Sequence, residues 1–183
     1  MPVVATSEGH EPLKPFLVPI HRTGWPFIGL FAGATVVLGA VFPTLGFAGI
    51  LLTAWCIYFF RDPDRVTPVR GGVIISPADG VVQMIDQAAA PEELEMGEGL
   101  RFRVAVFMNV FDVHVNRIPL DGTITRTSYR PGKFFNASLD KASEFNERQS
   151  LRLTSAEGHD IAVVQIAGLV ARRILCHTTQ GQE

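Results

Sequence analysis

Residues 23–60 read TGWPFIGLFAGATVVLGAVFPTLGFAGILLTAWCIYFF, a stretch without a single charged side chain. Pro43, closely followed by Gly46, divides it into two apolar halves, residues 25–42 and 44–60. A helix rises about 1.5 Å per residue, so each half would span roughly 25 Å, close to the hydrocarbon thickness of a bilayer. The pattern predicts a helical hairpin that crosses the membrane or re-enters on one side. A buried helical pair in a globular core is the alternative.

Positive residues flank this stretch on both sides: Arg22 precedes it, and Arg61 and Arg65 follow it. Because such residues favour the cytoplasmic side of a membrane, both ends of the hairpin are expected to face the cytoplasm. Small residues allow two helices to approach closely. The glycines expected to do so here are Gly24, Gly29, Gly33 and Gly39.

The composition of the 183 residues excludes several classes of function. The formal net charge is -2, and the basic residues are scattered along the chain, so nucleic-acid binding is not expected. The two cysteines, Cys56 and Cys176, lack the spacing of a zinc site, and the histidines show no ligand pattern either. We therefore expect no bound metal.

After residue 60 the sequence changes to short runs rich in β-branched residues and bounded by Gly, Pro or Asp, which is typical of strands. One helix is expected at residues 136–149, capped by Asn136 or Ser138. The predicted fold class is a mainly β (α+β) domain with an N-terminal helical membrane hairpin. The expected domains are residues 1–22, 23–60 and 61–183. The predicted strands are residues 73–75, 80–85, 102–110, 122–127 and 161–170, with a loop or single helical turn at 91–99.

Asp79 is the first candidate catalytic residue in this domain. It lies in SPADG at residues 76–80, where Pro77 and Gly80 predict a tight turn. From this spacing alone, the simpler interpretation is a turn carboxylate that accepts hydrogen bonds from backbone N–H groups. A buried carboxylate that holds an imidazole in one tautomer is the functional alternative.

His114 lies in DVHVNRIP at residues 112–119, directly after a predicted strand. Alternation along a strand would place Asp112, His114 and Asn116 on one face and the two valines on the other. That polar stripe fits the wall of a cleft and the exposed edge of a half-buried strand equally well.

A third segment, PGKFFNAS at residues 131–138, combines a cation with aromatic rings. Phe134 beside Lys133 fits a lipid-facing lip, in which the ring contacts acyl chains and the ammonium group contacts a headgroup phosphate. A core phenylalanine beside a solvated lysine is an equally good interpretation.

In their order and spacing, these motifs and YFFRDP at residues 58–63 resemble the phosphatidylserine decarboxylases, specifically their short, proteobacterial and archaeal-type branch. The resemblance implies decarboxylation of phosphatidylserine to phosphatidylethanolamine with release of CO2. The implied cofactor is a pyruvoyl group, made from a serine of the precursor by autocatalytic serinolysis. The implied partners are phosphatidylserine, membrane lipid and a small pyruvoyl-bearing chain from the same precursor. The chain could also form a homo-oligomer. The implied location is a bacterial inner membrane, with the catalytic domain facing the cytoplasm.

The resemblance also implies roles for individual residues. Asp79 would orient a histidine, and His114 would serve both in self-cleavage and as the proton donor in decarboxylation. One histidine is assigned both roles because Arg117 stands where the longer relatives carry a second one. The residues expected to bind substrate are Asn116, Arg117, Lys133 and Phe134.

Relatives of this kind are cleaved at a Gly-Ser bond near the C-terminus, and the sequence contains no Gly-Ser dipeptide. We therefore expect that the C-terminal end of the precursor is missing and that these residues alone are inactive. Two other functions stay open. One is a non-catalytic, membrane-anchored lipid-binding or scaffold module. The other is a hydrolase that uses Asp79, His114 and a serine, although no Gly-x-Ser-x-Gly elbow is present.

Overall fold

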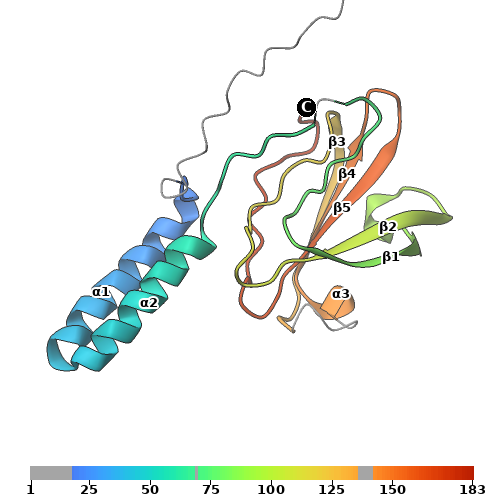
Figure 1. The fold of residues 1–183 in the computed structure, drawn as a ribbon. Helices are drawn as coiled ribbons and strands as arrows, with labels where there is room; N and C mark the ends of the chain where they lie inside the picture. Colours follow the sequence, from blue (N-terminus) through green and yellow to red (C-terminus); the bar gives the residue numbers. More distant parts are fainter. Residues whose placement is uncertain (1–17, 69, 136–141) are drawn as a thin grey trace, which may run out of the picture. The chain divides into compact units, whose positions relative to one another are not determined.

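The computed structural model describes residues 18–68, 70–135 and 142–183. The chain divides into two compact units, Met1–Val66 and Thr67–Glu183. The first unit contains helices α1 (Trp25–Val41) and α2 (Pro43–Phe59), and the second contains the strands and one short helix (Figure 1). The predicted fold class is thus confirmed: the protein is α+β and mainly β beyond its two apolar helices.

The helical hairpin forms where the sequence predicts it. Phe42 between the helices is extended, with φ -132° and ψ 97°, and its N–H donates to the carbonyl of Leu38. Pro43 then begins α2, where its missing N–H removes no helical hydrogen bond. Proline placement therefore sets both the end of α1 and the start of α2.

Only two of the four glycines that were expected to allow close packing of the helices, Gly24 and Gly39, lie close to another part of the hairpin. A Cβ on Gly39 would lie 3.0 Å from the Cα of Gly46, and one on Gly24 would lie 2.5 Å from an aromatic side chain. The expectation is wrong for Gly29 and Gly33, where an added Cβ would meet nothing within 4 Å. The helices therefore pack closely at Gly39 and Gly46 near the turn, and also at Gly49, where an added Cβ would lie 2.5 Å from the hydroxyl oxygen of Thr35.

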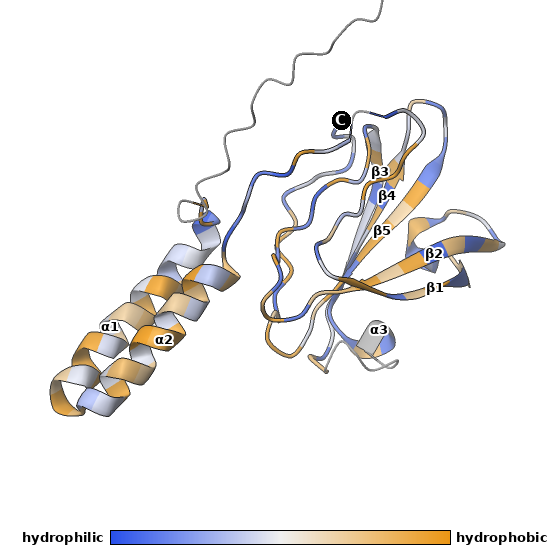
Figure 2. Ribbon diagram, viewed as in Figure 1, coloured by the Kyte–Doolittle hydropathy of each residue, from blue (hydrophilic) through white to orange (hydrophobic). Residues whose placement is uncertain are grey.

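Both helices expose apolar side chains around their surfaces (Figure 2). The hydroxyl oxygens of Thr35 and Thr53 lie 3.3 Å apart and join the helices by a hydrogen bond. Each hydroxyl oxygen also lies within hydrogen-bond distance of a carbonyl one turn earlier in its own helix, so the hydroxyl that donates there accepts from the other across the helices. Among the described residues, the helix at Arg22–Val41, 20 residues long, is long and apolar enough to cross a membrane. This exposed apolar surface favours association with a membrane.

The second unit contains two antiparallel sheets. Strands β1 (Val81–Ala89) and β2 (Leu100–Phe107) form one sheet, and the 3-10 turn η2 (Glu92–Leu94) lies in their connection. The other sheet has the order β3-β4-β5, from β3 (Thr123–Arg130), β4 (Arg148–Thr154) and β5 (Asp160–Ile166). Four of the predicted strands are confirmed with shifted ends. The strand expected at residues 73–75 is wrong, since these residues belong to neither sheet.

The helix predicted at residues 136–149 is largely wrong within the described part of the chain. Helix α3 covers only Ala142–Phe145, and β4 begins at Arg148; the candidate caps lie outside the described residues. The strand was missed because β4 carries polar residues on one face: Arg148, Ser150 and Arg152. That face is not exposed, because the carboxylate of Glu93 accepts hydrogen bonds from Arg148 and Ser150. The strand therefore buries polar groups that, in the sequence, are typical of a solvated helix.

Asp160 at the start of β5 is expected to stabilise this sheet in a pH-dependent way. Hydrogen bonds from Arg152 and then Thr154 hold the pKa of its carboxyl below the usual value. The stabilisation is therefore present above the ordinary carboxyl pKa of about 3.9 and is lost as the pH falls through the lower folded value. Asp160→Asn should lower the urea midpoint at pH 7 and lower it less at pH 3, where the pH is below the unfolded carboxyl pKa of about 3.9. The matched control is Asp121→Asn, and an equal loss at both pH values would contradict the prediction.

Candidate functional site

The second unit pairs two segments that lie far apart in the sequence. The N–H of Ile75 donates to the carbonyl of Pro119, and the N–H of Arg117 donates to the carbonyl of Pro77, each at 2.9 Å. These two bonds define an antiparallel register, although the segments are not regular strands. The first segment contains part of SPADG, which includes Asp79, and the second contains part of DVHVNRIP, which includes His114.

Asp79 lies two residues after Pro77, and His114 lies three residues before Arg117, so each candidate residue is close in sequence to the second of these bonds. Asp79 is half-buried, and Gly80 follows it with a φ of 157°. A Cβ on Gly80 would lie 2.3 Å from the carbonyl oxygen of Phe107, so only glycine fits here. The glycine thus lets the turn lie directly against the end of β2, and backbone pairing joins the two segments that contain the candidate catalytic residues.

His114 has a defined hydrogen bond at one ring nitrogen. Its Nδ1 lies 3.1 Å from the carbonyl oxygen of Asp112. Because a carbonyl only accepts, Nδ1 carries the proton, and Nε2 is the basic nitrogen of the neutral ring. The ring is half-buried, and the adjacent Val113 is only 1% exposed, which fixes the backbone at this point.

Residues 112–116 do not form the strand whose alternation was expected to place Asp112, His114 and Asn116 on one face. β2 already ends at Phe107, and a turn follows in which Asp112 accepts a hydrogen bond from the N–H of Asn109. The side chain of Asn109 in turn accepts from the N–H of Phe111. These side-chain bonds replace the ladder bonds of a strand. His114 therefore follows a turn that side-chain hydrogen bonds hold, and it does not lie on a strand.

Asn116 and Arg117 lie on the same paired segment as His114. The Oδ1 atom of Asn116 is buried and has no hydrogen-bond partner among the residues that the structure describes. An unsatisfied buried acceptor costs about 1–3 kcal/mol, so a ligand that donates a hydrogen bond here would recover that loss. The guanidinium of Arg117 donates to the carbonyl of Val115 at 3.4 Å.

Lys133 and Phe134 belong to a separate cluster built around Asn146. The buried amide of Asn146 accepts from the N–H of Phe135 and donates to the carbonyls of Phe135 and Ala167. The backbone of Lys133 also bonds to both neighbours of Asn146. This clamp holds the phenylalanine side chains partly exposed, at 37% for Phe134 and 43% for Phe135.

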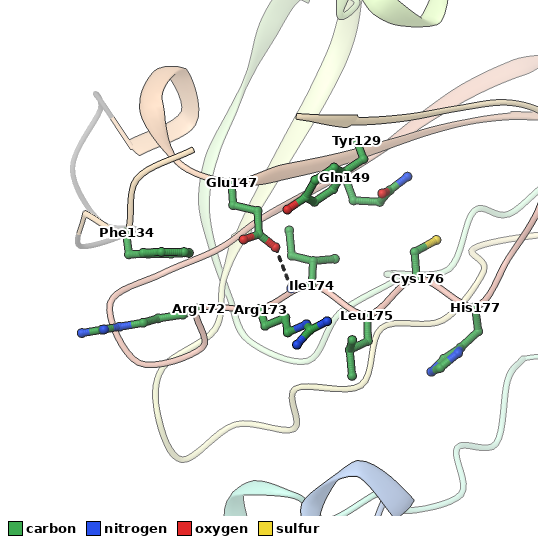
Figure 3. Close-up of a pocket in the computed structure, with 10 residues that line it drawn as sticks. All are labelled: Tyr129, Phe134, Glu147, Gln149, Arg172, Arg173, Ile174, Leu175, Cys176 and His177. Atoms are coloured by element: carbon green, nitrogen blue, oxygen red, sulfur yellow. Dashed lines mark hydrogen bonds between the residues drawn. The ribbon is translucent and has the colours of Figure 1, made fainter. Parts of the chain in front are cut away.

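A pocket of about 640 Å³ adjoins this cluster (Figure 3). Of the site residues that the sequence predicted, only Phe134 lines it. The sequence analysis missed Arg172, Arg173 and His177, which also line it. Two adjacent arginines after a strand were the available signal, but nothing local indicated that they border a cavity. No group of three potential metal ligands occurs in residues 18–68, 70–135 and 142–183.

The sequence is similar to proteins of known family over most of its length. A family described as phosphatidylserine decarboxylase matches residues 52–183. A protein of Paramagnetospirillum magneticum named phosphatidylserine decarboxylase proenzyme is 62% identical over 165 residues, which cover 90% of this chain and 69% of that protein. Proteins with the same name from Cereibacter sphaeroides and Rickettsia africae are 59% and 53% identical over 92% and 90% of this chain, and over 73% and 71% of their own lengths.

Proposed function

The chain belongs to the phosphatidylserine decarboxylase family, and from this membership we propose that it converts phosphatidylserine to phosphatidylethanolamine with release of CO2. The observation that carries the proposal is the backbone pairing of the Asp79 and His114 segments inside the region that the family matches. The proposed enzyme is made as a precursor, in keeping with the word proenzyme in the names of its relatives.

The proposed cofactor is a pyruvoyl group carried by a small chain cut from the same precursor. When bound, this group would supply an electron-withdrawing carbonyl that draws electrons from the bond to the departing carboxylate. Asn116 suits such a group, since its buried Oδ1, which has no partner among the described residues, would accept a hydrogen bond from the amide N–H beside the pyruvoyl carbonyls. Asn116 and His114 are the residues proposed to lie against it.

His114 is proposed to move the protons of the reaction. Its Nδ1–H is held by the carbonyl of Asp112, so Nε2 can accept a proton during self-cleavage and deliver one to the product. An imidazole suits both steps because it titrates near neutral pH. Asp79 is proposed to stabilise the protonated form of the ring by its negative charge, while the carbonyl of Asp112 sets the orientation of the ring.

Four residues are proposed to bind the substrate. The fork of Arg117 suits a carboxylate or phosphate, and Asn116 supplies a buried acceptor. Lys133 and Phe134 are proposed to form the lip that contacts lipid, with the ammonium of Lys133 5.7 Å from the ring centroid of Phe135.

The apolar helices support a membrane location for this reaction. We propose that residues 23–60 anchor the enzyme in a bacterial inner membrane, and that residues 61–183 form the catalytic domain on the cytoplasmic side. The exposed apolar surfaces of α1 and α2 and the arginines that flank them support this placement. Such an anchor would hold the enzyme at the surface where its lipid substrate lies.

Intact mass spectrometry of the protein expressed from its complete gene tests the precursor proposal. We expect two chains, the smaller one blocked by a pyruvoyl group at its N-terminus. The His114→Gln precursor should stay largely uncut, because the base for serinolysis is removed. A single uncut chain from the wild-type gene would favour a lipid-binding module without catalysis.

A further inference from the structure

The sheet formed by β1 and β2 carries an exposed apolar face. Directly opposite residues of an antiparallel pair share a face, and here Ile85 lies opposite Val104. Alternate residues along each strand join the same face, and apolar and polar residues alternate along β2 (Figure 2). We name this surface the β1–β2 apolar face. Its large side chains, between 51% and 73% exposed, are Val82, Ile85, Leu100, Phe102 and Val104.

The charged residues of this sheet lie on its opposite face. Asp86 is paired with Arg103 in the register, and the guanidinium of Arg103 donates to both carboxylate oxygens of Asp86. Arg101 belongs to the same side and donates to the carbonyl of Met96. The β1–β2 apolar face therefore contains no charged residue, and an exposed apolar surface of this kind marks a site of interaction.

A sheet of two strands also needs support from elsewhere in the protein, because an isolated hairpin is only marginally stable. Among residues 18–68, 70–135 and 142–183, β1 and β2 pair only with each other. Their connection is attached to the other sheet: the carbonyl of Glu95 accepts from Arg152 of β4, and its carboxylate accepts from Arg126 of β3. The hairpin is thus held at its connection, while its apolar face stays exposed.

The last residues of the sequence lie near this attachment. The N–H of Gly181 donates to the carbonyl of Ile124 at 2.7 Å, and the N–H of Ile124 donates to the carbonyl of Gln182 at 2.8 Å. One residue of β3 separates Ile124 from Arg126, so residues 181–182 and Glu95 are bound at neighbouring positions of the same strand. An extended chain advances about 3.3 Å per residue, so a segment that follows residue 183 would reach the start of β2 in about ten residues.

The relatives contain such a segment. Each is longer than the region that it shares with this chain, and the family match runs to residue 183. In the proposed precursor, the part that follows residue 183 therefore begins close to an apolar surface that is exposed without it.

We propose that the β1–β2 apolar face is the docking surface for the part of the precursor that follows residue 183, which includes the small chain. The inference rests on the proposed function, because it names the surface that this chain offers to the small one. A segment of the same polypeptide has a high effective concentration at the face, which a second copy of the chain lacks. A membrane fits less well, since surfaces that bind membranes carry cations beside the apolar side chains, and the arginines of this sheet lie on its other face.

Photo-cross-linking of the protein from the complete gene tests this surface. Phe102→p-benzoylphenylalanine places a photoreactive ring at the most exposed large side chain of the face. Mass spectrometry of the digested product should find this ring joined to residues that follow 183. An equal mixture with isotope-labelled protein separates contacts within one precursor from contacts between two copies. Cross-links only to a second copy or to lipid, or none to residues beyond 183, would overturn the proposal.

Val66→p-benzoylphenylalanine is the matched control, because Val66 is 89% exposed and lies outside the β1–β2 apolar face. It should give at least tenfold less of the same cross-linked product. As a second measurement, Phe102→Ser should lower the urea midpoint of the protein from the complete gene, and Val66→Ser should leave it unchanged. Only a covered ring loses contacts when it is truncated, so an unchanged midpoint in Phe102→Ser would contradict the docking.

Conversion of phosphatidylserine by the wild-type protein from the complete gene separates this inference from the proposed function. If phosphatidylethanolamine forms and no cross-link reaches residues beyond 183, the inference fails and the proposed function stands. If the cross-link forms within one precursor and no phosphatidylethanolamine appears, the docking surface stands and the proposed function fails.

Discussion

Replacing His114 with glutamine is expected to lower phosphatidylserine decarboxylation per cleaved molecule by roughly 100-fold or more. General acid–base catalysis by a positioned side chain contributes about 10²–10⁴-fold, and glutamine cannot carry a proton between donor and acceptor. The hydrogen bond from Nδ1 of His114 to the carbonyl of Asp112 makes this ring the positioned group. The measurement is release of labelled CO2 from carboxyl-labelled phosphatidylserine, divided by the fraction of precursor that mass spectrometry finds cleaved.

Division by the cleaved fraction separates the two roles proposed for His114. Loss of cleavage with a normal rate per cleaved molecule would limit the histidine to self-processing. Normal cleavage with a lost rate would limit it to decarboxylation. His159→Gln is the matched control, because His159 lies in the turn between β4 and β5 and lines no predicted site. Full cleavage and a normal rate in His114→Gln would refute the assignment altogether.

Replacing Gly132 with alanine is expected to destabilise the second unit by about 3 kcal/mol, the upper range for overpacking a well-packed site. A Cβ at Gly132 would lie 2.3 Å from the carbonyl carbon of Asn146 and 2.5 Å from the nitrogen of Glu147. Both atoms belong to backbone that hydrogen bonds hold against Lys133, so neither can move away cheaply. Urea unfolding followed by circular dichroism measures the change.

Gly71→Ala is the control for this substitution, because a Cβ at Gly71 would meet nothing within 4 Å. Its effect should stay within about 0.5 kcal/mol, as for most surface changes. Equal stability of the Gly132 and Gly71 variants would show that the clamp around Asn146 is loose. A destabilised Gly132 variant should also bind phospholipid less tightly, since the clamp positions Phe134 in the pocket wall.

The sequence could predict the features that depend on neighbouring residues. The charge-free stretch and Pro43 placed both helices within one or two residues, because a helix start and an apolar surface are local properties. Four strands followed from β-branched runs and glycine or proline boundaries. The resemblance to a family followed from motif order and was confirmed by the match over residues 52–183.

Only the tertiary structure decided how distant segments meet. β4 was missed because its arginines are paired with Glu93 and Asp160, two partners that lie outside the strand. The hydrogen bonds between residues 75–77 and 117–119, which pair the segments containing Asp79 and His114, have no local signal. The pocket with Arg172 and Arg173 likewise depends on the bond from Glu147 to a segment 27 residues later. Local patterns determined the two helices and four of the strands, whereas long-range hydrogen bonds and ion pairs determined β4 and which chemical groups the elements bring together.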